Sequence, residues 1–182
     1  ILLQNKLFSN VFNISMDCKG IINVYKNQYK ELKKKLENRN FNKNAIEREM
    51  EYIKNKLLGY ANLSLEIKKM LSEDNGAFFS MYMDYMELSL IFLFFNMKEE
   101  AKKALYSLKE ILEKYPIHEN LDVSQMRFFD KVESKNLYTF NIYTNLLIVL
   151  NDDSYNELRE EPIFKDVIEK ILDMEKMLKN KE

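Results

Sequence analysis

Residues Phe78–Pro116 decide the fold of this chain, and they read FFSMYMDYMELSLIFLFFNMKEEAKKALYSLKEILEKYP. The stretch contains two helix-length segments that meet at Asn96 and Met97. The first segment is apolar almost all round, whereas the second is amphipathic, with one apolar stripe made by Ala101, Leu105, Leu108 and Leu112. A helix without a polar face must be covered by neighbouring elements on several sides. We therefore expect this pair of helices to lie at the centre of an all-helical packing.

The composition of the whole chain also favours helices. The 182 residues include only three glycines and two prolines, and 46% of them are hydrophobic. A β-rich fold of this length needs many more turn residues, whereas long helices need few. The sequence therefore predicts an all-α fold of antiparallel helix hairpins, with about seven or eight helices in a single domain that spans residues 1–182.

The balance of charges excludes some classes of partner. The chain has 28 basic and 29 acidic residues, so its net charge of −1 creates no global field that attracts nucleic acid or an anionic membrane. No apolar run is long enough and free enough of charge to read as a membrane span. Cys18 is the only cysteine, which rules out a disulfide framework and favours a reducing, cytoplasmic setting. We expect no membrane and no direct nucleic-acid partner for this segment.

Residues that usually carry catalysis or bind metals are scarce. His118 is the only histidine, so multi-histidine metal sites are excluded, and it lies in a polar connection after Pro116. The chain contains no glycine-rich phosphate loop, no GxSxG motif and no cysteine–histidine pair at a useful spacing. We therefore expect no catalytic residues, no cofactor and no metal, and we do not expect an enzyme.

Residues 1–76 are expected to form a long helical hairpin region. Ile1–Asn13 has helical spacing, and Asp17 is predicted to cap a separate second helix. After a turn, Asn44 is predicted to cap another long helix, in which Gly59 marks a kink or a close approach between helices.

One face of the helix after Asp17 is rich in basic residues, namely Lys26, Lys30, Lys33, Lys34, Lys35 and Arg39. Such a face is either a patch for phosphates or acidic partners, or simply a solvated helix face. The second interpretation is favoured because no aromatic side chains are interleaved for stacking on bases.

Residues 117–182 are expected to supply closing helices. Ser124–Lys135 is predicted to be a short helix. The aromatic and β-branched content of Leu137–Leu150 suits a strand, but the spacing of Tyr143, Leu146 and Leu150 favours a helix. The last amphipathic helix is predicted to begin near Pro162.

The stretch 77–116 resembles a tetratricopeptide repeat, aligned on Ala101 as the small residue of the second helix. Its other positions fall on Tyr85, Leu88, Ser89, Phe92, Asn96, Leu105 and Leu108, with Ser89 and Asn96 in place of glycines. The segment with Tyr155, Leu158, Arg159, Pro162 and Phe164 resembles the tail that closes bacterial arrays of this family. Neither flank of the central stretch repeats it at the family's period of about 34 residues. The resemblance implies an α–α superhelix.

The same resemblance implies a protein- or peptide-binding module, whose ligands lie on the concave side lined by first helices. Carrying those positions over gives five candidate partner-binding residues: Met83, Met86, Leu90, Leu93 and Phe94. The alternative is that these residues are core, since their helix is apolar all round.

Two other functions fit the sequence. Because Ile1 is not an initiator methionine, the chain is expected to be a fragment of a longer protein. It would then suit the peptide-sensing C-terminal domain of a transcriptional regulator with an upstream DNA-binding domain. The other alternative is a structural bundle that forms a homodimer through the hairpin Ile21–Leu36 and Ile46–Leu71.

Overall fold

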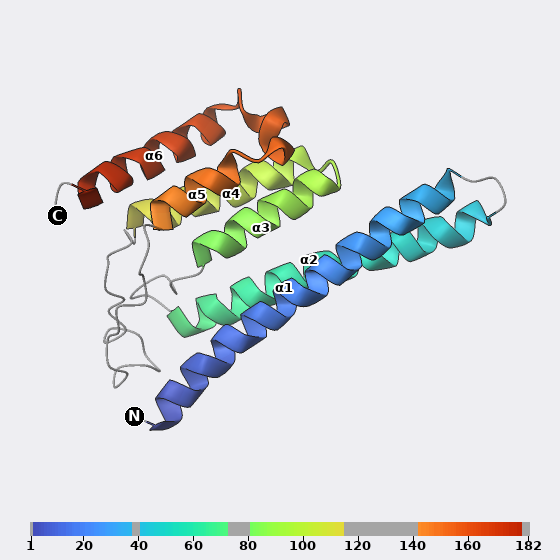
Figure 1. Cartoon of the computed structure of the whole chain (residues 1–182), viewed down its shortest axis with the longest axis horizontal. Helices are drawn as coiled ribbons and strands as arrows, with labels where there is room; N and C mark the ends of the chain where they lie inside the picture. Colours follow the sequence, from blue (N-terminus) through green and yellow to red (C-terminus); the bar gives the residue numbers. More distant parts are fainter. Residues whose placement is uncertain (1, 38–40, 73–80, 115–141, 180–182) are drawn as a thin grey trace.

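The computed structural model describes residues 2–37, 41–72, 81–114 and 142–179, which are almost entirely helical (Figure 1). The helices are α1 Leu2–Leu36, α2 Lys43–Ser72, α3 Met81–Phe94, α4 Lys98–Lys114, α5 Ile142–Leu150, the 3₁₀ helix η2 Asp153–Leu158 and α6 Pro162–Lys179. These ranges contain no strand, so the predicted all-α class is confirmed. The predictions for His118 and for the short helix Ser124–Lys135 lie outside the described residues.

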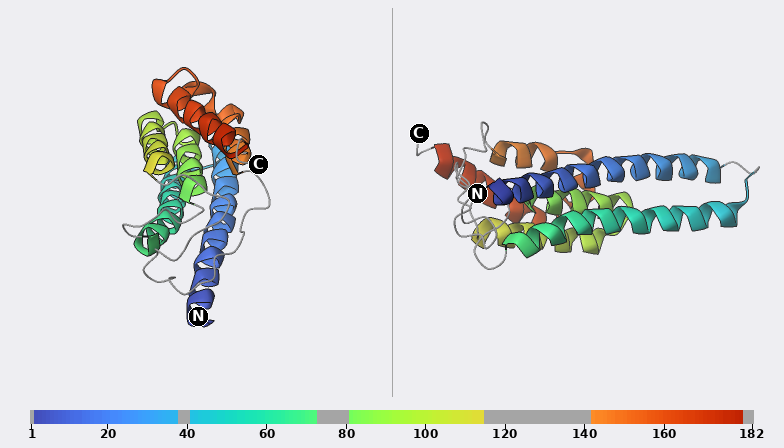
Figure 2. Two further views of the ribbon diagram at one scale, coloured as in Figure 1. Left: turned by 90° about the vertical axis from the view of Figure 1, so that its left-hand side faces the viewer. Right: turned by 90° about the horizontal axis from the view of Figure 1, so that it is seen from below.

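Successive helices pair into hairpins that stack in chain order. The pairs are α1 with α2, α3 with α4, and α5 with α6. Between the pairs, α2 lies against α3, α4 lies against α6, and α5 touches α3 (Figures 1 and 2). The three pairs differ widely in length, with α1 having 35 residues and α4 only 17. The superhelix and the tetratricopeptide resemblance stay predictions.

The α1/α2 hairpin extends well beyond the other helices (Figures 1 and 2). Its seam is apolar, with Ile22, Leu32, Ile46 and Ile53 buried. The rings of Tyr25 and Tyr60 stack across the seam with centroids 6.0 Å apart. Near the base of the projection, Tyr29 and Lys54 contact the end of α3.

The predicted break between two helices near Asp17 is wrong, because α1 is a single helix through this region. Cys18 and Ile22 are both buried, so the apolar face runs on past the expected boundary. Asp17 is exposed within the helix. A residue that suits an N-cap does not end a helix when the buried stripe continues on both sides of it.

Two predictions about α2 are also corrected. The capping residue is Asn42 rather than Asn44, because the Asn42 side-chain oxygen accepts a hydrogen bond from the Ala45 N–H at 3.2 Å. The helix runs unbroken through Gly59, and a Cβ added there meets nothing within 4 Å. Gly59 therefore marks neither an interruption of α2 nor a close approach between described helices.

The turn between α3 and α4 forms where the sequence predicts it. Asn96 has a positive φ of 55°, a conformation that asparagine tolerates better than most residues. The Met97 N–H donates to the Phe92 carbonyl at 2.8 Å, and the Asn96 N–H donates to the Leu93 carbonyl at 2.9 Å. These two bonds are the Schellman pattern that ends a helix.

The C-terminal elements also follow local sequence signals. Residues 142–150 are helical, as predicted for the Leu137–Leu150 stretch. Pro162 is the first residue of α6, where its missing N–H is no loss. The Arg159 side chain holds the connection together by donating to the Asn151 carbonyl at 3.0 Å.

Candidate partner-binding surfaces

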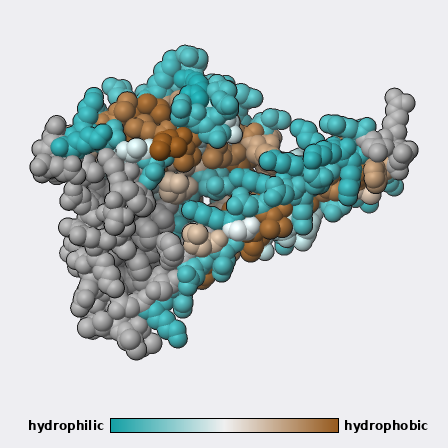
Figure 3. Space-filling view, viewed as in Figure 1, coloured by the Kyte–Doolittle hydropathy of each residue, from teal (hydrophilic) through white to brown (hydrophobic). Residues whose placement is uncertain are grey.

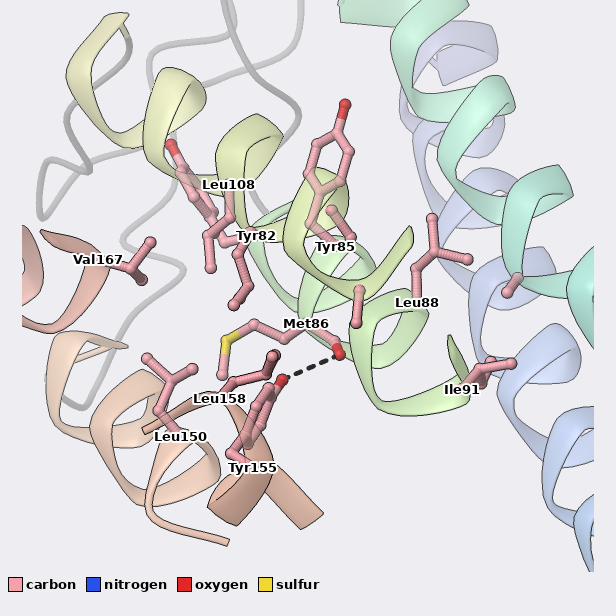
Figure 4. Close-up of a cluster of buried hydrophobic side chains, with 14 of the residues drawn as sticks. Tyr82, Tyr85, Met86, Leu88, Ile91, Leu108, Leu150, Tyr155, Leu158 and Val167 are labelled. Atoms are coloured by element: carbon pink, nitrogen blue, oxygen red, sulfur yellow. Dashed lines mark hydrogen bonds between the residues drawn. The ribbon is translucent and has the colours of Figure 1, made fainter. Parts of the chain in front are cut away.

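Met86 lies in the core, so its assignment to a partner-binding surface is wrong. Its side chain has 0% exposure and points toward Leu150, Tyr155 and Leu158 (Figure 4). The Met86 carbonyl accepts a hydrogen bond from the Tyr155 hydroxyl at 3.2 Å. The alternative interpretation of the apolar helix, that it is core, holds at this position.

The other four predicted binding residues are partly exposed. Met83, Leu90 and Leu93 pack against the core, and the Phe94 ring meets the Tyr29 ring edge-on at 5.4 Å. Between them along α3, Glu87 forms an ion pair with Lys26 of α1 at 2.6 Å. The structure thus places α1 beside this side of α3, and partner binding by the four residues stays a prediction.

Ser89 links α3 to the C-terminal elements. Its hydroxyl lies 2.6 Å from the Tyr155 hydroxyl and donates to the Met86 carbonyl at 2.8 Å. Burial raises the pKa of Tyr155 far above its ordinary value of 10.0, so the phenol stays protonated and acts as a structural hydrogen-bond group. The residue that stands where the resemblance expects a glycine is therefore one end of a buried polar contact.

A buried ion pair joins α2 to α3, and sequence reasoning missed it. Lys68 is 1% exposed and Asp84 is 4% exposed, with Nζ and Oδ2 only 2.5 Å apart. The Ser64 hydroxyl donates to the other carboxylate oxygen of Asp84 at 3.2 Å. Burial lowers the pKa of Lys68, and the nearby Asp84 carboxylate opposes this shift. The signal in the sequence was an aspartate inside a mostly apolar helix, because a carboxylate that becomes buried requires a partner.

The lysine-rich face of α1 is solvated along most of its length. Lys30, Lys33 and Lys34 are exposed and line a shallow hollow of about 470 Å³, together with Glu31 and Glu37. Lys34 forms an ion pair with Glu31 at 2.6 Å. The carboxylates within this hollow make it a poor match for a phosphate.

An apolar groove of about 770 Å³ opens between α5 and α6. Its apolar lining consists of Leu147, Ile148, Leu150, Phe164, Ile168 and Leu172. Ile148 is 65% exposed and Leu172 is 38% exposed. Figure 3 shows apolar side chains gathered over α5 and α6, with hydrophilic ones around them. We call this opening the α5/α6 groove.

Polar and charged side chains surround the α5/α6 groove, namely Thr144, Asn151, Arg159, Lys165, Glu169, Asp173 and Lys176. Two of these charges form ion pairs. Lys165 pairs with Glu160, which does not line the groove, at 2.7 Å, and Lys176 approaches Asp173, which does line it, at 3.9 Å. An apolar floor with a mixed polar rim is the ordinary composition of a site for a protein or peptide.

Comparisons of the chain with protein-family models, with curated proteins and with solved structures found no match. Within the described ranges, no group of three or more histidine, cysteine, aspartate or glutamate side chains is arranged to hold a metal ion. None of the helices in those ranges has both the length and the apolarity needed to cross a membrane.

Proposed function

We propose that this chain is a protein- or peptide-binding helical module without catalytic activity, and that its main binding site is the α5/α6 groove. The observation that carries the proposal is an open groove of about 770 Å³ that is lined by six apolar side chains and edged by polar ones. Its size falls within the usual range of ligand sites. Grooves between two helices accept the apolar face of a third helix or of an extended peptide.

A partner that covers the exposed apolar side chains of the groove would gain free energy by removing them from water. Ile148 is 65% exposed and Leu172 is 38% exposed, although both are apolar side chains. Full burial of such a side chain contributes about 1.5–3 kcal/mol. These two residues therefore act as the anchors of the proposed site.

A second, smaller surface on α3 is also proposed to contact partners. It consists of the exposed parts of Met83, Leu90, Leu93 and Phe94, and it excludes the buried Met86. Methionine and leucine at such a surface adapt to different side chains by repacking. This surface is secondary because α1 already lies against part of it.

We place the proposed module in the cytoplasm because of the environment of Cys18. Cys18 is the only cysteine of the chain and is buried. Burial raises the pKa of its thiol, which reduces the reactive thiolate. A single buried, unreactive thiol suits a reducing compartment.

The test of this function is a capture experiment with cross-linking. The bait is the chain itself, compared with the double variant Ile148→Glu/Leu172→Lys, and cross-links are mapped by mass spectrometry. A partner segment cross-linked to α5 or α6, and lost in the double variant, supports the proposal. The matched control is Tyr106→Glu, because Tyr106 is 58% exposed on α4 and does not line the groove.

Capture that is equally strong with the double variant contradicts a binding role for the α5/α6 groove. Circular dichroism must show the same helix content in all baits. Since Ile148 and Leu172 are already exposed, charges at these positions are not expected to unfold the chain.

Dimerisation through the α1/α2 hairpin is a second candidate function. Tyr52, Leu63 and Met70 lie on the outer side of α2 and are 56%, 46% and 70% exposed. A mass that doubles with concentration in sedimentation, and returns to that of a monomer in Leu63→Lys, would favour this role. A monomeric mass at all concentrations would exclude it.

A further inference from the structure

The α5/α6 groove has two ends that differ in charge. Because the two helices are antiparallel, the end of α5 lies beside the start of α6, where Arg159 and Lys165 line the groove. Toward the other end lie the carboxylates of Glu169 and Asp173, with the single ammonium of Lys176. The hydrogen bond between Thr144 of α5 and Glu175 of α6, at 2.6 Å, confirms which helix ends meet there.

We propose that the occupant of the α5/α6 groove is an amphipathic helix with acidic residues at its N-terminal end and basic residues at its C-terminal end, lying parallel to α6. This inference rests on the proposed function. Acidic side chains would meet Arg159 and Lys165, and basic side chains would meet Glu169 and Asp173. Lys165 and Asp173 already have an ion-pair neighbour each, Glu160 at 2.7 Å and Lys176 at 3.9 Å, so Arg159 and Glu169 contribute most of the difference in charge between the two ends. An opposite orientation places like charges together at both ends of the groove.

The stability of the partner helix itself favours the same order of charges along it, with acidic residues first and basic residues last. Acidic residues stabilise the start of a helix and basic residues stabilise its end, through the helix dipole. The charge order that suits the groove is therefore the order that many stable helices already have. Such a helix needs no special sequence beyond an apolar stripe at positions i, i+3, i+4 and i+7.

The length of the groove limits the length of the bound segment. Helix α5 has nine residues, which corresponds to about 13 Å at 1.5 Å per residue. A bound helix therefore makes its main contacts over roughly two and a half turns, or about nine residues. Its apolar side chains would lie against Leu147, Ile148 and Ile168, with Leu172 at the acidic end.

The experiment uses two synthetic 14-residue helical peptides with the same composition and the same apolar stripe. The first has glutamates at its N-terminal end and lysines at its C-terminal end, and the second has these charges reversed. Binding is measured by fluorescence anisotropy at low and high salt. We expect the first peptide to bind about threefold to tenfold more tightly at low salt, with the preference shrinking at high salt.

A charge exchange in the protein provides the decisive comparison. The variant Lys165→Glu/Glu169→Lys reverses the charge order in the groove, so it should prefer the second peptide. The matched control is Lys43→Glu/Glu47→Lys, which exchanges an exposed pair of the same spacing on α2. This control should bind like the unchanged protein.

The outcomes separate the inference from the proposed function. If both peptides bind equally to the unchanged protein, and neither binds to Ile148→Glu/Leu172→Lys, the groove binds helices but the proposed orientation is overturned. If neither peptide binds, or if Ile148→Glu/Leu172→Lys binds both unchanged, the role of the groove fails as well. Sedimentation that shows a dimer lost in Ile148→Glu would also overturn the inference, because the occupant would then be a second copy of the chain.

Discussion

The ion pair between Lys68 and Asp84 places two charges where almost no water reaches them. Such a pair contributes little net stability, because the cost of removing both charges from water offsets their attraction. Its main effect is on geometry. The two side chains meet only when α2 lies on α3 in one register, so a shifted register leaves a buried charge without its partner.

Substitutions at this pair should therefore be strongly coupled. Lys68→Met, or Asp84→Leu, should each lower the free energy of unfolding by about 3–5 kcal/mol, because each removes the opposite charge that lies against the remaining buried one. The double variant should lose much less than the sum. Urea denaturation of the four proteins measures the coupling energy.

The exposed pair Lys34–Glu31 is the control for this cycle. Its removal should change the free energy of unfolding far less than the removal of either buried charge, because water screens an exposed pair. Additive losses at Lys68 and Asp84 would show that the two charges act independently, against the structure.

Helix boundaries show how far local sequence signals reach. Asn96 and Pro162 act within one turn of the chain, through backbone conformation and a missing N–H, and their roles could be predicted from the sequence. Whether Asp17 begins a helix could not be predicted from its neighbours alone, because a cap-forming residue marks a helix boundary only where the buried apolar stripe also ends. In the same way, the cap of α2 is Asn42 rather than Asn44. The sequence could not distinguish them, because both positions carry asparagine, which suits an N-cap.

The glycine inside α2 gives a direct test at this scale. Gly59→Ala should raise the free energy of unfolding by about 0.5–1 kcal/mol, since alanine restricts the unfolded chain and its methyl group meets nothing within 4 Å. Thermal or urea unfolding measures the gain. Gly20→Ala in α1 is the matched comparison, because a Cβ there is also free of contacts. A loss of stability at Gly59 alone would indicate that another chain approaches α2 at this point.

The arrangement of the whole molecule depends on contacts between distant parts of the sequence. The helical class and the order of the hairpins follow from apolar periodicity, which each segment carries by itself. The partner of Asp84, the burial of Met86 and the exposure of Ile148 depend on how separate helices meet. Because the apolar residues of α3 lie on nearly all sides of the helix, its sequence did not distinguish those that face the core from those at the surface.

The projecting part of the α1/α2 hairpin is covered by fewer helices than α3, and this difference should appear in the rates of amide hydrogen exchange. The projecting part of the hairpin, residues 30–37 and 41–53, is packed essentially on one side, whereas α3 is covered by helices from all three pairs. We expect amides of the projection to exchange much faster than those of α3 and of the buried face of α4. Mass spectrometry of peptides after exchange measures the difference. Equal protection would indicate that the projection is covered in solution.

The same projection has a mechanical consequence. With 35 residues, α1 is a rod about 50 Å long, and its contacts through Tyr29 lie partway along it. Leu36, the last residue of α1, lies seven residues beyond Tyr29, which is about 10 Å at 1.5 Å per residue, so a rotation of about 10° at this pivot displaces it by only about 2 Å. The hairpin would therefore carry a change in how it seats on α3 to its far end as a small, rigid shift.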